Sequence, residues 1–86
     1  MIVKGMSSAA QRQRILKALF DQGSLTTLDI RHQLSIMSPA PRIFELRRSG
    51  YSIASYPVDV RDCEGNLHKG VARYVLQGLP EAANDD

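Results

Sequence analysis

Three arginines lie close together in the middle of the chain, at Arg42, Arg47 and Arg48. A guanidinium group donates its hydrogen bonds in a planar fork, which suits phosphate oxygens and the O6 and N7 atoms of guanine. The same group also pairs with a carboxylate three residues away on a helix, and Glu45 follows Arg42 at that spacing. Both roles are open for Arg42, and guanine recognition is the one that we predict.

The other side chains that could do chemistry are few and poorly spaced for it. Cys63 and His68 provide fewer ligands than a zinc site needs, and a nucleophile at this pair would lack supporting groups. Asp59, Asp62 and Glu64 do not follow the spacing of a calcium-binding loop. No glycine-rich phosphate-binding loop occurs in the sequence. The chain is therefore predicted not to be an enzyme and to hold no metal, cofactor or small-molecule ligand.

The arginines lie on a helix that the sequence predicts over residues 39–49. Ser38 is placed to cap it, since its hydroxyl can accept a hydrogen bond from a free amide of the first turn. Pro39 and Pro41 fall in that first turn, where an amide has no carbonyl partner within the helix. Gly50 is placed to end the helix in a left-handed conformation.

At about 100° per residue, this helix has a narrow apolar side and a wide polar side. Pro39, Ile43 and Leu46 form the apolar side, which is expected to face the core. Ala40 and Arg47 lie at its edge, so Arg47 could pack its stem against a neighbouring element or reach a ligand. The polar side, which carries more cations than acids, holds Pro41, Glu45, Arg48 and Ser49, with Arg42 on the flank.

A longer helix is predicted over residues 9–22, with Ser7 or Ser8 as its cap and Gly23 at its end. Its apolar residues recur at a spacing that places them on one face of a helix. They are Ile15, Leu16, Leu19 and Phe20.

A short helix is predicted over residues 27–34, after a connector at residues 24–25. Thr26 opens a capping box at its start. Ile36 and Met37 are expected to anchor the next turn in the core. A helix, a short helix, a tight turn and a basic helix follow the helix-turn-helix plan.

The pattern changes from helical to alternating after the basic helix. Residues 51–60 and 71–76 alternate between apolar and polar types, which predicts two strands joined by a loop over residues 61–69. Pro57 indicates an edge strand or a bulge, because proline cannot donate to a ladder of hydrogen bonds. Three helices followed by a β-hairpin make an α+β winged helix-turn-helix domain, here expected over residues 8–76.

Length and composition fit one small domain. The chain has 86 residues, of which 43% are hydrophobic and 23% are charged, as is ordinary for a soluble globular protein. No apolar run approaches the roughly 20 residues of a membrane span, and the N-terminus lacks the apolar length of a signal peptide. A lone Cys63 cannot form an internal disulfide and favours a reducing cytoplasm. The sequence therefore predicts a cytoplasmic protein without a membrane partner.

The net charge of +2 is unevenly distributed along the chain. All eleven Lys and Arg residues lie within residues 1–80, whereas three of the nine acids lie within the last six residues. A basic body of this kind favours an anionic partner, of which nucleic acid is the commonest. Residues 1–7 are expected to form a flexible arm, with Ile2 and Val3 suited to a short edge strand, and residues 77–86 a disordered acidic tail.

Several segments together resemble the small helix-turn-helix domains that are common among phage and prophage proteins. The segments that carry the resemblance, which covers residues 9–76, are residues 27–31, 36–40, 42–47, 50–53 and 72–74. In that group the commoner phrase is Ser-Pro-Ala-Ala-Arg, whereas Pro41 stands here in place of the second Ala and removes an amide. The resemblance implies a winged fold and DNA binding.

A helix-turn-helix directs the start of its second motif helix at base edges, while the first crosses the backbone. The residues expected to approach bases are Ser38, Ala40, Pro41 and Arg42, and Glu45 and Arg48 on the exposed face could follow them. Ala40 or Pro41 could contact a thymine methyl group. The residues expected to contact phosphates are Thr26, Thr27 and Arg31, together with Arg61 and Lys69 in the wing. Capping of the short helix is the other role for the two threonines.

Two hypotheses for function follow. The first is a sequence-specific double-stranded DNA-binding protein, either a phage- or prophage-type transcriptional regulator or an excision or replication accessory factor. The second is a winged-helix protein-interaction module that does not bind DNA, such as a phage inhibitor of a host factor. The acidic residues near the wing tip favour this hypothesis. Since one helix-turn-helix reads few base pairs, a homodimer on a two-fold site is also expected.

Overall fold

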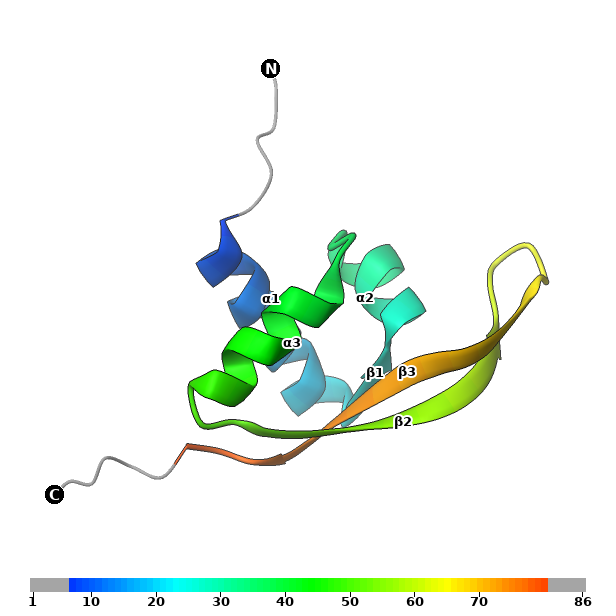
Figure 1. The fold of residues 1–86 in the computed structure, drawn as a ribbon. Coiled ribbons are helices and arrows are strands. Elements are labelled where there is room, and N and C mark those ends of the chain that lie inside the picture. The colour runs from blue at the N-terminus through cyan, green and yellow to red at the C-terminus, as the bar shows by residue number, and fades with distance from the viewer. Residues whose placement is uncertain (1–6, 81–86) are drawn as a thin grey trace, which may run out of the picture.

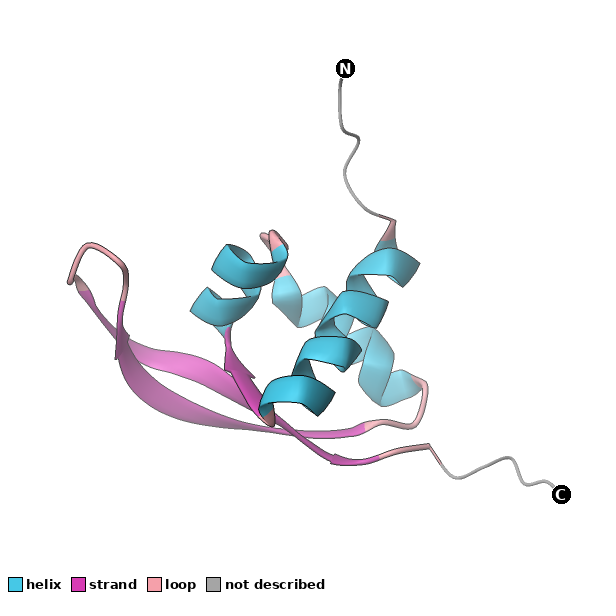
Figure 2. Cartoon of the chain, turned by 180° about the vertical axis from the view of Figure 1, so that it is seen from behind, coloured by secondary structure: helices cyan, strands magenta, loops and turns pink. Residues whose placement is uncertain are grey.

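A computed structural model of the chain describes residues 7–80. Its three helices gather on one face of a three-stranded antiparallel sheet in the order β1-β3-β2 (Figure 1; Figure 2). The elements along the chain are α1 (Ser8–Gln22), β1 (Ser24–Thr26), α2 (Thr27–Leu34), α3 (Pro39–Arg48), β2 (Ser52–Arg61) and β3 (Leu67–Gly78). The α+β winged helix-turn-helix class is confirmed, although the sheet has one strand more than the predicted hairpin.

The three predicted helices are all present, and local capping explains where they start. Ser7 rather than Ser8 caps α1, because its hydroxyl accepts a hydrogen bond from the amide of Ala10 at 3.1 Å. Thr26 and Asp29 form the predicted capping box of α2, with each side chain accepting from the other residue's amide. None of the helices within residues 7–80 has the length and apolarity that crossing a bilayer would need.

The segment predicted as a connector at residues 24–25 is instead the strand β1. It pairs with β3, so that Leu25 lies opposite Tyr74 and is fully buried. The Arg73 guanidinium also donates a hydrogen bond to the Ser24 hydroxyl at 2.8 Å. Three residues are too few to show an alternating pattern, and the partner strand lies some fifty residues further along the chain. The wing is therefore part of a three-stranded sheet.

The β2–β3 hairpin is longer than predicted. β3 begins at Leu67, so His68 and Lys69 lie on a strand and not in the loop, and it continues through Gly78, beyond the predicted domain end at residue 76. Pro57 lies on the edge strand β2, as predicted, opposite Ala72. The irregularities of the ladder lie elsewhere, at residues 52–53 and 58–60.

The predicted arm and tail are covered only in part. The edge strand suggested for Ile2 and Val3 lies outside the described residues, as do residues 81–86 of the predicted tail.

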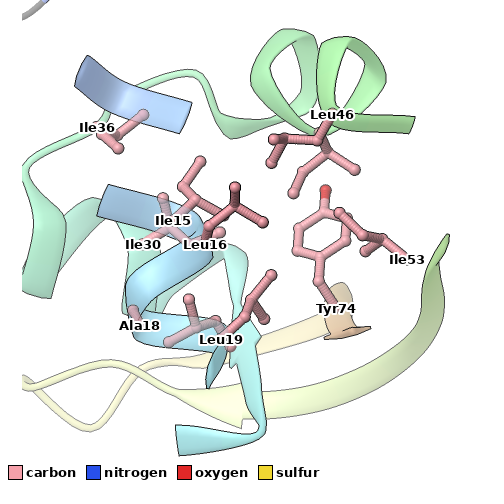
Figure 3. Close-up of a cluster of buried hydrophobic side chains, with 11 residues drawn as sticks. Ile15, Leu16, Ala18, Leu19, Ile30, Ile36, Leu46, Ile53 and Tyr74 are labelled. Carbon is pink, nitrogen blue, oxygen red and sulfur yellow. The ribbon is translucent and has the colours of Figure 1, made fainter. Parts of the chain in front are cut away.

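The core lies between the helices and the inner face of the sheet (Figure 3). Figure 3 shows Tyr74 of β3 and Ile53 of β2 directed toward Leu46 of α3. The predicted apolar side of α3 is buried, as is Ile36 in the turn before it. The buried hydrophobic residues are Ile15, Leu16, Ala18, Leu19, Leu25, Ile30, Ile36, Ile43, Leu46, Ile53 and Tyr74.

Two residues that were expected in the core are exposed. Met37 is 66% exposed and Phe20 is 60% exposed. Of the two residues of the turn, Ile36 is buried and Met37 is exposed. Phe20 lies at the outer edge of the apolar face of α1, where its neighbour Leu19 takes the buried position.

Candidate nucleic-acid interface

The helix α3 is held between two well-defined ends. Pro39 occupies its first position, but the Ser38 hydroxyl makes no capping hydrogen bond, which corrects the prediction for that side chain. At the other end, the amide of Gly50 donates to the Arg47 carbonyl and that of Tyr51 to the Leu46 carbonyl, the pattern of a Schellman motif. Gly50 has φ +105°, as predicted for a residue that ends a helix in the left-handed region.

The exposed face of α3 differs from the predicted one. Its exposed residues are Ala40, Pro41, Phe44, Arg47 and Arg48. Glu45, predicted on the open side, is half-buried because it turns toward α1, and Arg42 turns the same way. The open face is consequently apolar along its first half and basic at its end.

Arg42 and Glu45 belong to an ion-pair network that joins α3 to α1. The Glu45 carboxylate accepts from Arg12 at 2.8 Å and from Arg42 at 2.9 Å. The hydrogen bond from Arg12 is the largest influence that lowers the pKa of Glu45, and Arg42 adds to it. The Arg42 side chain is only 18% exposed, and it also donates to Gln11 at 3.4 Å. The structure thus shows Arg42 in its alternative role, as the partner of Glu45.

Arg47 connects α3 to the edge strand. Its Nε and Nη2 atoms both donate to the Ile53 carbonyl, at 3.0 and 2.8 Å. Two bonds from a planar guanidinium that converge on one carbonyl oxygen restrict its orientation. Arg47 therefore links α3 to β2, and only the rest of its exposed surface is available to a partner.

Arg48 is the exposed arginine of α3 that has no polar partner among residues 7–80. Its guanidinium carbon lies 5.8 Å from the centroid of the Phe44 ring, one helical turn before it. This distance is that of a cation–π contact. Because no hydrogen bond or ion pair within the described chain engages it, Arg48 can donate all its N–H groups to a ligand.

The first motif helix, α2, offers fewer contacts than predicted. Thr26 is 3% exposed and its hydroxyl accepts from the Asp29 amide, so it caps the helix and does not reach a phosphate. Thr27 is half-buried at the first helical position. Arg31 is exposed, and its Nε donates to the Met37 carbonyl at 2.9 Å, which braces the turn between the motif helices. Its remaining N–H groups make no other hydrogen bond within residues 7–80.

The wing tip is organised around a carboxylate. Asp62 accepts from the amides of Glu64 and Asn66, both at 2.9 Å, and lies 2.9 Å from Nε2 of His68. These hydrogen bonds, that of His68 first, lower the pKa of Asp62 to about 2. The Nη1 atom of Arg61 donates a hydrogen bond to the Gly65 carbonyl. The ionised Asp62 carboxylate is therefore engaged by hydrogen bonds from within the hairpin tip.

The predicted site residues fall into two separate groups. Ser38, Ala40, Pro41 and Arg48 share the exposed side of α3 and the turn before it, beside Arg31. Arg61 and Lys69 lie near the hairpin tip, which extends beyond the helices and stands clear of α3 (Figure 1). Lys69 is exposed and has no polar partner within the described chain.

Sequence reasoning missed Phe44, which is 58% exposed in the middle of the open face. The spacing of Ala40, Phe44 and Arg48, each four residues from the next, could have identified it.

A family model described as a winged helix-turn-helix domain matches residues 10–78, which is most of the chain. No curated protein and no solved structure gave a significant match.

Proposed function

The chain belongs to the family of winged helix-turn-helix domains, and from that premise we propose that it binds double-stranded DNA sequence-specifically through α3. Membership of this family suggests that the chain binds DNA. The finer role that we propose is that of a phage- or prophage-type transcriptional regulator or an excision or replication accessory factor, acting in the cytoplasm.

The observation that carries the proposal is the open face of α3. Its exposed residues are Ala40, Pro41, Phe44, Arg47 and Arg48, and the hairpin tip stands clear of α3 (Figure 1). A major groove about 12 Å wide admits an α-helix. In a helix-turn-helix the preceding helix crosses the phosphate backbone, and the exposure of Arg31 on α2 supports a phosphate contact there.

The structure shifts our assignment of direct readout from Arg42 to Arg48. Arg42 is committed to Glu45 and largely buried, so freeing it would cost the contacts that hold α3 on α1. Arg48 is exposed without a polar partner among residues 7–80. We assign Ser38, Ala40 and Pro41 to the base-facing side, and Thr27, Arg31, Arg61 and Lys69 to phosphates.

The test is selection of a binding site from duplexes with a randomised central segment, followed by fluorescence anisotropy with the selected duplex. Arg48→Ala should weaken binding about tenfold or more, since a guanidinium that recognises guanine contributes on the order of 1–3 kcal/mol. Lys17→Ala removes the same charge from an 80% exposed side chain on α1 and should bind as the wild type does. Arg42→Ala should lower the melting temperature, because it removes a contact between α3 and α1. The affinity of the folded variant for the selected duplex should change less than that of Arg48→Ala.

A second candidate is a winged-helix module that binds a protein instead of DNA. Phe44 and Met37 favour it, because both are large apolar side chains that are exposed, one on α3 and the other in the turn before it. Failure of the folded wild-type protein to retain any duplex from the library would support this candidate and contradict DNA binding.

We also propose that two copies act together on a two-fold DNA site, because a single helix-turn-helix contacts few base pairs. Sedimentation with and without the selected duplex tests this. A complex with one chain per duplex, on a site without two-fold symmetry, would contradict it.

A further inference from the structure

Half of the exposed face of α3 is apolar, which is unusual for a helix expected to meet DNA. Phe44 occupies its centre with 58% of its surface exposed, and Ala40 precedes it by one turn. Pro41, also exposed, extends this apolar surface at the start of the helix. In a domain with so small a core, an aromatic ring left in water is a candidate for a binding role.

Arg48 covers part of the Phe44 ring and leaves the rest open. The guanidinium carbon lies 5.8 Å from the ring centroid, and the side chains lie one turn apart on the helix. The contact restricts both side chains before any ligand binds, so less conformational entropy is lost on binding. A partner would thus meet an apolar surface at Ala40, Pro41 and Phe44, followed directly by a free cation.

The edges of base pairs in the major groove differ in how well they suit such a surface. Each edge presents hydrogen-bond donors and acceptors, and thymine adds a C5-methyl group that apolar side chains, phenylalanine included, contact. A phenyl ring placed against a wholly polar base-pair edge would leave the hydrogen-bond donors and acceptors of that edge without partners. Thymine is therefore the base that this part of α3 fits.

We propose that Phe44, flanked by Ala40 and Pro41, reads the methyl groups of thymine in the major groove, and that it is a specificity-determining residue. This inference depends on the proposed DNA-binding function. It adds to that function the chemical class of sequence recognised, which is a thymine-containing segment opposite the centre of α3. The cation of Arg48 then falls on the neighbouring base pair or phosphate.

The experiment replaces thymine by deoxyuridine, which removes the methyl group and keeps the hydrogen-bonding pattern. The selected duplex is synthesised with deoxyuridine at one thymine position at a time, and affinities are measured by anisotropy. For the wild type we expect about a fourfold loss at one or two positions, the value of one buried methyl group. Phe44→Ala should bind the thymine duplex more weakly than the wild type does. It should bind the corresponding deoxyuridine duplex as well as it binds the thymine duplex.

Two further variants make the comparison specific. Phe20→Ala removes another exposed phenylalanine, 60% exposed on α1, and should keep the wild-type sensitivity to deoxyuridine. Phe44→Gln replaces the aromatic ring by a polar side chain with good helix propensity and should lose the sensitivity as the alanine variant does. Circular dichroism of each variant confirms that it is folded.

The outcomes separate this inference from the function on which it depends. Tight wild-type binding that no deoxyuridine substitution changes would overturn the role of Phe44 and leave DNA binding intact. Equal sensitivity in the wild type and Phe44→Ala would overturn it too. Absence of binding to every duplex in the library would overturn both proposals at once.

Discussion

At the residue scale, three arginines on one helix have three different surroundings, and these decide what each can do. Arg42 forms an ion pair with Glu45, and Arg47 donates hydrogen bonds to the Ile53 carbonyl of β2. Arg48 is exposed to solvent and contacts the Phe44 ring. The side chains are chemically identical and lie within seven positions of one another. Only Arg48 has all its donors available to a partner from outside the described chain.

A prediction at this scale concerns Asp62. Its pKa is lowered to about 2, so the ionised carboxylate stabilises the folded hairpin. This contribution is fully present above the ordinary pKa near 3.8 and is lost as the pH falls through 2. Asp62→Asn should therefore lower the melting temperature at neutral pH, and the difference from the wild type should shrink in acid.

Thermal melts of both proteins between neutral and strongly acid pH provide the measurement. Glu64→Gln is the control, because it removes an equal charge from the same turn, where the Glu64 side chain has no hydrogen bond within the described residues. A difference between wild type and Asp62→Asn that stays constant down to the lowest pH would contradict the role assigned to the carboxylate.

At the element scale, the position of α3 depends on how the helix ends and on what it is tied to. The Schellman motif at Gly50 turns the chain sharply into β2, and Arg47 fastens the same helix end to that strand. Glu45 ties the opposite flank to Arg12 of α1. The helix is consequently held from two sides, which leaves its third side open.

A prediction at this scale compares two glycines that end helices. Gly50 and Gly23 both have positive φ, but a Cβ atom on Gly50 would meet Cβ of Pro80 at 3.0 Å, whereas one on Gly23 would meet nothing within 4 Å. Gly23→Ala should cost about 1–3 kcal/mol of unfolding free energy from backbone strain alone. Gly50→Ala should cost more, as measured by urea denaturation. Equal costs would show that Pro80 can move away from the added Cβ atom without a loss of stability.

At the scale of the whole molecule, the sheet carries the hairpin tip away from the helices (Figure 2). One domain thus offers two separate contact regions, α3 and the wing. The two regions differ in charge: the wing holds Arg61 and Lys69 beside three acids, of which Asp62 and Asp59 accept hydrogen bonds from within the hairpin. Contacts of the wing should therefore strengthen binding without reading sequence.

The corresponding prediction concerns salt. Affinity for the selected duplex should fall linearly with the logarithm of the salt concentration, with a slope of about 0.9 for each phosphate neutralised. Lys69→Ala should reduce this slope by about 1 and weaken binding to unrelated duplexes to the same degree. Lys17→Ala should leave the slope unchanged. An unchanged slope for Lys69→Ala would place the wing away from the DNA.

The sequence by itself determined the three helices, the edge position of Pro57 and the general fold. Capping boxes, proline at the first helical position and the period of apolar residues all act within a few residues, so they can be read along the chain. The bounds of α2, residues 27–34, were predicted to the residue for this reason.

The tertiary structure alone decided the strand β1, the outward positions of Met37 and Phe20, and the division of roles among the arginines. Leu25 becomes a strand residue because Tyr74 lies opposite it, and Arg42 becomes a partner of Glu45 within a network completed by Arg12 of another helix. Contacts between residues so far apart in sequence depend on how helices and sheet pack. A local pattern carries no information about that packing. The spacing of Ala40, Phe44 and Arg48 indicates that they share a face of the helix, but the packing of the other faces against α1, the core and β2 is what leaves this face open.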